Sequence, residues 1–318
     1  MEWISDERFA EQLDTVVEPF LAARRETGFD ERVPGEPIYY EHYRADSPKA
    51  VVVISHGFTE SIRKYAECMY YLLQAGYEVW GLDHRGHGRS YRDNDNPYVV
   101  YVRRFKDYVF DLHHLTETKI QPAADGLPLY LYCHSMGGNI GVRMLELFPG
   151  YYSKAVLSSP MLGLSFANIP LAAALAVVSV RSIGPGGRQP LSPVGAMPEE
   201  TFEASAANSE PRFRWYYEKK LADPQLQTCV AANSWGREAI LACGLASQRS
   251  KIARIRIPLL LFQAGDDSFV KNEAQDEFAS FAPDCTMQKM PGLRHELYFS
   301  DTETLKKYWE QIFAFYGE

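Results

Sequence analysis

The chain has 318 residues, 46% of them hydrophobic, which is enough to bury the core of one large α/β domain or of two ordinary domains. Its formal net charge of −8 comes without a basic cluster, which argues against a nucleic acid partner and weakens the case for electrostatic docking on anionic lipid. The five cysteines form no Cys-x-x-Cys pair, so we expect neither a disulfide framework nor a zinc ribbon.

The amino-terminal segment is not expected to be a signal peptide, because acidic residues interrupt its apolar positions and no basic stretch precedes them. Apolar residues recur at helical spacing over residues 5–25 and predict a helix there. The longest apolar run, residues 169–180, is shorter than the roughly 20 residues that span a bilayer. We therefore expect a cytoplasmic protein, and leave open a peripheral contact with the inner face of the membrane.

Strand and helix patterns alternate through the first half of the chain. The predicted strands cover residues 50–55, 77–83, 129–133 and 155–158, and the predicted helices cover 62–75, 107–120 and 138–148. From residue 164 to 250 this order stops, and helical and irregular segments with Gly and Pro replace it. Strands return at 257–262 and 286–290, and a helix is predicted over 302–316.

This alternation predicts an α/β protein with a mostly parallel central sheet and helices on both faces. We expect residues 1–163 and 251–318 to form the α/β core, and residues 164–250 to form a helical cap inserted between its two parts. Ligands bind at the carboxyl ends of the strands in such folds, so the insert is expected to act as a lid over the site.

The segment 129–138, Leu-Tyr-Leu-Tyr-Cys-His-Ser-Met-Gly-Gly, has the order of strand, tight turn and helix that a nucleophile elbow requires, with Ser135 at its tip. Such an elbow strains the serine and needs small residues two positions before and after it. Gly137 meets this need, whereas Cys133 stands where glycine is usual. We expect burial to keep Cys133 unreactive.

A serine hydroxyl is a weak nucleophile until a base takes its proton, and that base must be oriented by a third group. His295 follows the last predicted strand, and two adjacent carboxylates, Asp266 and Asp267, follow the strand before it. The order Ser, Asp, His is that of the α/β-hydrolase fold. We favour Asp267, three residues before Val270, because this matches the usual spacing of the acid loop, with Asp266 as the alternative.

An oxyanion hole needs two backbone N–H groups aimed at the developing negative charge. We assign one to Met136, directly after the nucleophile, and the other to Phe58, in the loop after the first long apolar strand. The Phe58 side chain is also expected to border the acyl pocket. We expect His56 and Glu60 to hold this loop rather than to react.

Neither a cofactor nor a metal is expected. The turn at residues 83–90 contains Gly86 and Gly88 but has Tyr91 where a dinucleotide fingerprint needs glycine, so we interpret it as a support for the site. His113 and His114 are adjacent on a predicted helix and point apart, so they cannot share a metal.

Taken together, the chain resembles the α/β-hydrolase superfamily, and within it most closely the bacterial lysophospholipase group that includes monoacylglycerol-lipase-like enzymes. The similarity runs nearly end to end. It rests on residues 56–61 with 64–67, 83–90, 104–108, 134–138, 295–296, and Trp235 with 237–241 in the insert.

The resemblance implies hydrolysis of carboxylic esters of single-chain lipids, with Ser135 as nucleophile, His295 as base and Asp267 as the group that holds the His295 tautomer. Residues 161–180 are apolar enough to line an acyl channel, with Met161, Leu162 and Leu164 as substrate-binding residues. A plain lid core or a dimer contact is the alternative.

The expected partners are a small lipid ester and water, with the lid as the part that would touch a membrane. Arg181 and Arg188 are the candidates to meet a phosphate head group. A lysophospholipase is favoured; the alternatives are a monoacylglycerol lipase, a small-ester carboxylesterase and a catalytically silent binding module of the same fold.

Overall fold

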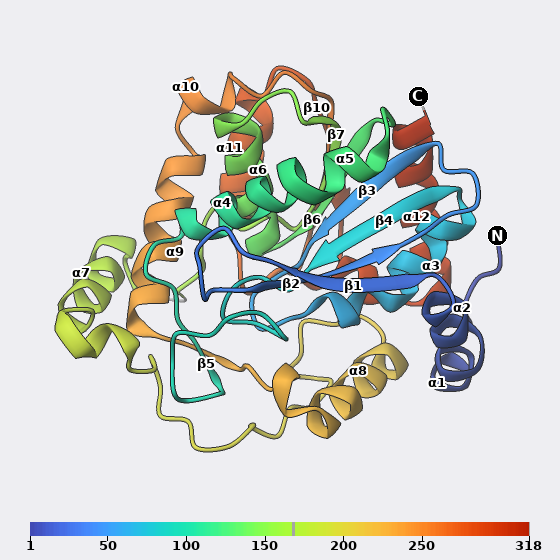
Figure 1. Cartoon of the computed structure of the whole chain (residues 1–318). Coiled ribbons are helices and arrows are strands. Elements are labelled where there is room, and N and C mark those ends of the chain that lie inside the picture. Colours follow the sequence, from blue (N-terminus) through green and yellow to red (C-terminus); the bar gives the residue numbers. More distant parts are fainter. Residues whose placement is uncertain (167–168, 318) are drawn as a thin grey trace.

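An eight-stranded sheet forms the centre of the protein (Figure 1), whose computed structural model describes residues 1–166 and 169–317. The strand order is β1-β2-β4-β3-β6-β7-β9-β10. The bounds are β1 Arg25–Asp30, β2 Ile38–Tyr43, β3 Ala50–Ser55, β4 Tyr77–Leu82, β6 Leu129–His134, β7 Tyr152–Ser158, β9 Leu259–Ala264 and β10 Cys285–Met290. All neighbours from β4 to β10 are parallel, and β2 is antiparallel to β1 and β4. The predicted mostly parallel α/β sheet is confirmed.

Helices cover both faces of this sheet (Figure 1). Residues of α4, α6 and α11 pack in one core, and residues of α1, α3 and α12 pack in the other. Their bounds, with the short helical turns beside them, are α1 Phe9–Gln12, η1 Leu13–Val17, α2 Glu18–Ala22, η2 Ile62–Tyr65, α3 Ala66–Gln74, α4 Lys106–Leu115, η3 Thr116–Ile120, α5 Gln121–Ala124, α6 Met136–Leu147, α11 Asn272–Phe281, η6 Leu297–Phe299 and α12 Thr302–Gly317.

The β3 strand shows why a continuous apolar run folds as a central strand. Val51 and Val53 enter one core, whereas Val52 and Ile54 enter the other. Successive side chains of a strand point to opposite faces, so a strand covered on both faces needs apolar residues at every position. The predicted bounds of residues 50–55 agree with the observed strand.

The two strands at one edge, β1 and β2, were missed, and the helix predicted over residues 5–25 ran into the first residue of β1. The observed helical segment ends at Ala22. The β1 sequence Arg-Glu-Thr-Gly-Phe-Asp is largely exposed and polar, as expected of a sheet edge. Such a strand lacks the apolar run by which the central strands were predicted.

Within the segment 164–250, the described residues form helices, as expected, together with one short strand. Its elements are α7 Leu171–Arg181, η4 Gly184–Arg188, α8 Glu210–Ala222, η5 Pro224–Leu226, β8 Val230–Ala231, α9 Asn233–Ala246 and the start of α10 Arg249–Ile252. β8 pairs in parallel with β5 Val99–Val100, which ties the segment to the loop after β4. Two residues are too few to leave a strand pattern in a sequence.

No helix within residues 1–166 or 169–317 has the length and hydropathy needed to cross a bilayer. The division of the chain into a core and a cap stays a prediction.

Candidate active site

Ser135 sits in the sharp turn between β6 and α6, with φ 52° and ψ −116°. Such a conformation costs a non-glycine residue roughly 1–3 kcal/mol and persists only where its surroundings impose it. Two backbone hydrogen bonds do so: Ser135 N donates to Ser158 O at 3.1 Å, and Met161 N donates to Ser135 O at 2.8 Å. A Cβ at Gly137 would lie 2.0 Å from Ser55 O, so the backbone approach requires glycine there.

Cys133 is fully buried, and a glycine on α6 makes room for it. A Cβ placed at Gly141 would stand 2.5 Å from Cys133 Sγ, which shows that the sulfur occupies this space. Burial raises the pKa of the Cys133 thiol above its ordinary value. The thiol is therefore kept neutral, in agreement with the expectation that it is unreactive.

The structure brings together Ser135, His295 and Asp267, each from a loop that follows a strand. His295 Nε2 lies 2.8 Å from Ser135 Oγ, and His295 Nδ1 lies 2.6 Å from Asp267 Oδ2. Ser135 is 8% exposed and His295 is 6% exposed, so the group is mostly shielded from water. A base within hydrogen-bond reach of the hydroxyl, itself held by a carboxylate, is the arrangement that activates a serine.

Of the two adjacent aspartates, Asp267 makes the contact with His295, while Asp266 is exposed. Asp267 Oδ1 accepts hydrogen bonds from the N–H groups of Phe269 at 2.9 Å and Val270 at 3.0 Å. Burial raises the pKa of Asp267, but the hydrogen bond and charge of His295 and the two amide donors outweigh burial, so the pKa lies below its ordinary value. The carboxylate is therefore ionised when it faces the imidazole.

The loop that carries Phe58 is held by buried polar groups. Gly57 N donates to Glu60 Oε2 at 2.7 Å, and His84 N donates to His56 Nε2 at 2.9 Å. These contacts agree with the supporting roles expected for His56 and Glu60. The Phe58 ring lies against the Trp235 ring, with 3.9 Å between their centroids. Hydrogen bonds from buried polar groups and an aromatic contact with α9 thus hold the loop in place.

The oxyanion-hole role of the Phe58 and Met136 N–H groups stays a prediction. Within the described residues, neither Phe58 N nor Met136 N donates a hydrogen bond to another backbone oxygen. Met136 is the first residue of α6, where N–H groups have no partner inside the helix. The positive end of the helix dipole also favours negative charge at this position.

A cavity of about 400 Å³ lies beside His295. It is lined by Phe58, Thr59, Glu60, Lys64, His134, Glu199, Glu200, Thr201, Ala204, Ser205, Ala206, Phe213, Tyr216, Tyr217, Lys220, Phe269, His295, Glu296 and Phe299. Phe58 belongs to this lining, and its place beside the acyl chain stays a prediction. Aromatic rings and charged groups share the wall, so the cavity suits an amphipathic molecule.

Met161, Leu162 and Leu164 do not line this cavity. Met161 and Leu162 are buried in the core beneath the elbow, and Leu164 is half-buried and forms a β-bridge with Val270. Their role in an acyl channel stays a prediction. Residues 167 and 168, part of the predicted channel range 161–180, lie outside the described residues.

Sequence reasoning gave no role to Lys64 and Glu296, which form a buried ionic group in the cavity wall. Lys64 Nζ lies 3.0 Å from Glu60 Oε1 and 2.6 Å from Glu296 Oε1. Burial lowers the pKa of Lys64, but the charges of Glu296 and Glu60 outweigh it and hold the pKa above its ordinary value. Both residues lie in the motifs on which the family resemblance rests, and those motifs were the signal that could have drawn attention to them. Their pairing could not be predicted, because they are 232 positions apart in the sequence.

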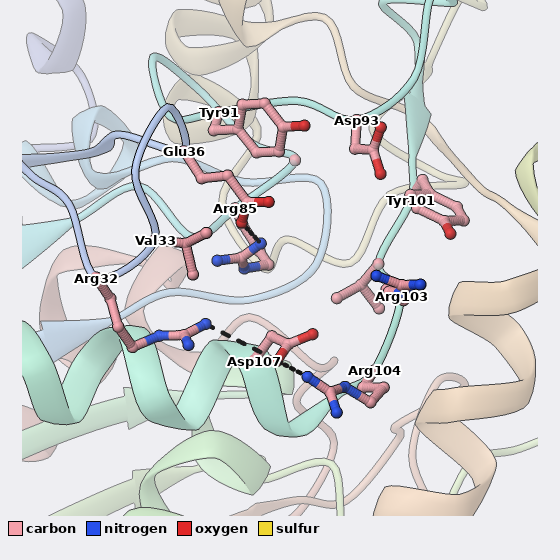
Figure 2. A pocket seen from close by; sticks show the side chains of 12 residues that line it. Arg32, Val33, Glu36, Arg85, Tyr91, Asp93, Tyr101, Arg103, Arg104 and Asp107 are labelled. Carbon is pink, nitrogen blue, oxygen red and sulfur yellow. Dashed lines mark hydrogen bonds and ion pairs between the residues drawn. The ribbon is translucent and has the colours of Figure 1, made fainter.

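Figure 2 shows another pocket, of about 210 Å³, which several arginines line. Arg85 lies 2.8 Å from Glu36. Arg32 and Arg104 lie 3.8 Å and 3.2 Å from Asp107. Each of these three guanidinium groups is thus ion-paired with a carboxylate of the protein, and none of the predicted site residues lines this pocket.

The sequence matches the family described as "Serine aminopeptidase, S33" (Hydrolase_4) over residues 46–303. Lysophospholipase L2 of Escherichia coli (strain K12) is 31% identical over 249 residues, which cover 76% of this chain and 71% of that protein. Monoacylglycerol lipase of Mycolicibacterium smegmatis is 30% identical over 274 residues, which cover 84% of this chain and 88% of that protein.

Among solved structures, a soluble variant of monoglyceride lipase from Saccharomyces cerevisiae in complex with a substrate analog has a TM-score of 0.74. The match covers 92% of this chain and 94% of that one at 17% identity. A carboxyl esterase from Bacillus coagulans matches with a TM-score of 0.71 at 16% identity, over 92% and 98% of the two chains. At these identities the likeness concerns the fold alone.

Proposed function

The chain belongs to the serine aminopeptidase S33 family of α/β-hydrolases, and on that premise we propose that it is a lysophospholipase that cleaves the ester of single-chain phospholipids. The observation that carries the proposal is the continuous hydrogen-bonded path from Asp267 through His295 to Ser135. The relatives support the coarser assignment to serine hydrolases of the lysophospholipase and monoacylglycerol lipase group. The lysophospholipid substrate itself is our proposal.

In the proposed mechanism, Ser135 Oγ attacks the ester carbonyl carbon while His295 Nε2 takes the hydroxyl proton. Asp267 holds the His295 Nδ1–H and stabilises the imidazolium that forms. The N–H groups of Phe58 and Met136 bind the oxyanion of the tetrahedral intermediate.

His295 next donates its proton to the glycerol oxygen, and the alcohol leaves an acyl group on Ser135. Water then attacks the acyl carbonyl while His295 takes a proton from it, and the second tetrahedral intermediate collapses to release the fatty acid and restore the serine. No step of this sequence requires a cofactor.

We also propose that residues 164–250 form the cap over this site. Phe213, Tyr216 and Lys220 of α8 line the cavity together with His295, so the segment supplies part of its wall. On α7 and the turn after it, Val177, Val180 and Ile183 are 56%, 69% and 74% exposed. Exposed apolar side chains grouped on a helix are typical of a surface that enters the interfacial region of a membrane.

A serine-directed phosphonate tests the nucleophile: it should label the wild-type protein and fail to label Ser135→Ala. Equal labelling of both proteins would overturn the assignment. Hydrolysis of lysophosphatidylcholine, lysophosphatidylethanolamine and monoacylglycerol with the same acyl chain then tests the substrate, and we expect the two lysophospholipids to be cleaved with the higher kcat/KM.

Monoacylglycerol lipase is the second candidate, and the 30% identical relative from Mycolicibacterium smegmatis favours it. A preference for monoacylglycerol in the matched series would select this function. A preference for acetyl over decanoyl esters would select a small-ester carboxylesterase, and no turnover of any ester would indicate a binding module.

A further inference from the structure

Lys220 brings an ammonium group to the cavity beside His295 without a hydrogen-bond partner among the described residues. It lies on α8, is 6% exposed, and lines the cavity. Its nearest counter-charge is Glu200, with 3.7 Å between Nζ and Oε1, which is too long for a hydrogen bond. The donors of Lys220 are therefore available to a ligand.

The other lysine in the cavity wall differs in this respect. Lys64 Nζ is hydrogen-bonded to Glu60 and Glu296, so its charge is already used within the protein. Of the two lysines that line the cavity, Lys220 is the one whose charge can meet an incoming anion.

The arginines that the sequence suggested for a head group are also engaged elsewhere. Arg181 donates to the carbonyl oxygens of Pro190 and Leu191, each at 3.2 Å. Arg188 pairs with Asp93 at 2.7 Å. Neither arginine lines the cavity beside His295.

A buried ammonium group without hydrogen bonds is unfavourable unless a ligand or a neighbour compensates the charge. Burial lowers the pKa of Lys220, and the charge of Glu200 offsets this effect only in part. A phosphate oxygen bound at Nζ would supply both the missing hydrogen bond and the missing negative charge.

We propose that Lys220 binds the phosphate of the substrate head group and thereby selects lysophospholipids over monoacylglycerols. This inference rests on the proposed function and adds the residue that reads the head group. His295 and Lys220 line the same cavity, and His295 Nε2 lies 2.8 Å from Ser135 Oγ, so one molecule can bring its ester to the Ser135–His295 pair and its phosphate to Lys220. Glu199 and Glu200 share that wall, and their carboxylates favour a head group that also carries a cation, such as phosphoethanolamine.

Lys219 provides a matched control on the same helix. Its side chain is 45% exposed, pairs with Asp14 at 2.9 Å, and does not line the cavity. Removing either lysine takes one positive charge from α8, so a difference between the two variants reports the position of the charge rather than its loss.

The experiment measures kcat/KM of the whole protein on lysophosphatidylethanolamine and on monoacylglycerol with the same acyl chain. In Lys220→Met we expect kcat/KM on lysophosphatidylethanolamine to fall by at least about tenfold, mainly through KM, since the charge-assisted hydrogen bond to the phosphate is lost. The kcat/KM on monoacylglycerol, which carries no phosphate, should fall by less than about threefold. Lys219→Met should match the wild type, and Lys220→Arg should retain part of the preference. Thermal unfolding of each variant verifies folding.

Equal losses on both substrates would assign Lys220 a structural role, and no loss on either would remove it from the site; either result overturns the inference. A wild-type protein that cleaves monoacylglycerol but no lysophospholipid would overturn the proposed function as well. This outcome needs the wild-type protein alone, so it is distinguished from a failure of the inference about Lys220. Glycerophosphoethanolamine should inhibit monoacylglycerol hydrolysis in the wild type and not in Lys220→Met. Equal inhibition by inorganic phosphate would assign the site to free phosphate instead.

Discussion

The sulfur of Cys133 occupies the space above Gly141, where a side chain would place its Cβ 2.5 Å from Sγ and 3.4 Å from the Cys133 Cβ. Cys133 is the last residue but one of β6, the strand that leads into the elbow, and Gly141 lies on α6, the helix that leaves it. The elbow therefore accommodates a cysteine at a position where glycine is usual, because the following helix has a glycine, without a side chain, opposite the sulfur. The two residues form one packing unit.

Gly141→Ala is expected to destabilise the wild-type protein by about 1–2 kcal/mol, because overpacking costs about 1–3 kcal/mol and alanine regains up to about 1 kcal/mol of helix propensity. In a Cys133→Ala background the sulfur is gone, and the same substitution should be neutral or stabilising. Urea unfolding of the four proteins of this cycle measures the coupling. An equal cost in both backgrounds would contradict the proposed contact.

Asp267→Asn should lower kcat by on the order of 10³–10⁴, because an amide no longer stabilises the imidazolium and allows the wrong tautomer. Asp266→Asn, one residue away and exposed, is the matched control and should stay within about threefold of the wild type, as surface substitutions usually do. Steady-state hydrolysis of a soluble ester measures both variants. A larger loss in Asp266→Asn would reverse the assignment of the acid.

Acidification should destabilise the loop that carries Phe58. Complete burial lowers the pKa of His56 from 6.5 to about 4, and its Nε2 accepts the His84 N–H, so the folded state holds the neutral imidazole. Below pH 6.5 the unfolded chain binds a proton here that the folded chain does not, so this contribution to stability is complete above pH 6.5 and is lost as the pH falls towards 4. At about 1.4 kcal/mol per pKa unit, the loss is roughly 3 kcal/mol.

Urea unfolding at pH 7, 5.5 and 4 measures this effect, with His56→Gln as the comparison. Burial raises the pKa of Asp83 to about 6, which acts in the opposite direction, so the difference between wild type and variant isolates His56. The variant should lose less stability than the wild type between pH 6.5 and 4. Identical pH dependence of the two proteins would contradict the prediction.

The exposed apolar residues on and after α7 should govern binding to lipid. Val180→Asp combined with Ile183→Asp should reduce co-sedimentation with phosphatidylethanolamine vesicles by severalfold, because each aspartate must stay in water. Phe29→Asp, at a side chain that is 55% exposed on β1, is the control for a general loss of surface hydrophobicity. Equal vesicle binding by all three proteins would exclude this surface as the membrane contact.

Much of the fold could be predicted from local patterns. The run of residues 50–55 is apolar at every position, and it forms a strand covered on both faces. The order of Ser135, Asp267 and His295 along the chain is that of the α/β-hydrolase fold. The three residues follow strands of a parallel sheet, and the loops after such strands meet at one edge of the sheet. The edge strand β1 was missed because its largely exposed polar residues carry no such pattern. Its neighbour β2 is mostly buried, but Glu41 and His42 interrupt its apolar residues.

By itself, the sequence determined the fold class and predicted the nucleophile and the pair of aspartates that offers the acid, since these depend on patterns among neighbouring residues. The tertiary structure placed Asp267 rather than Asp266 against His295 and packed Cys133 against Gly141. It also left Lys220, in the wall of the cavity, without a hydrogen-bond partner among the described residues. Those results depend on distances between atoms of separate elements, and such distances exist once the sheet and its helices have packed.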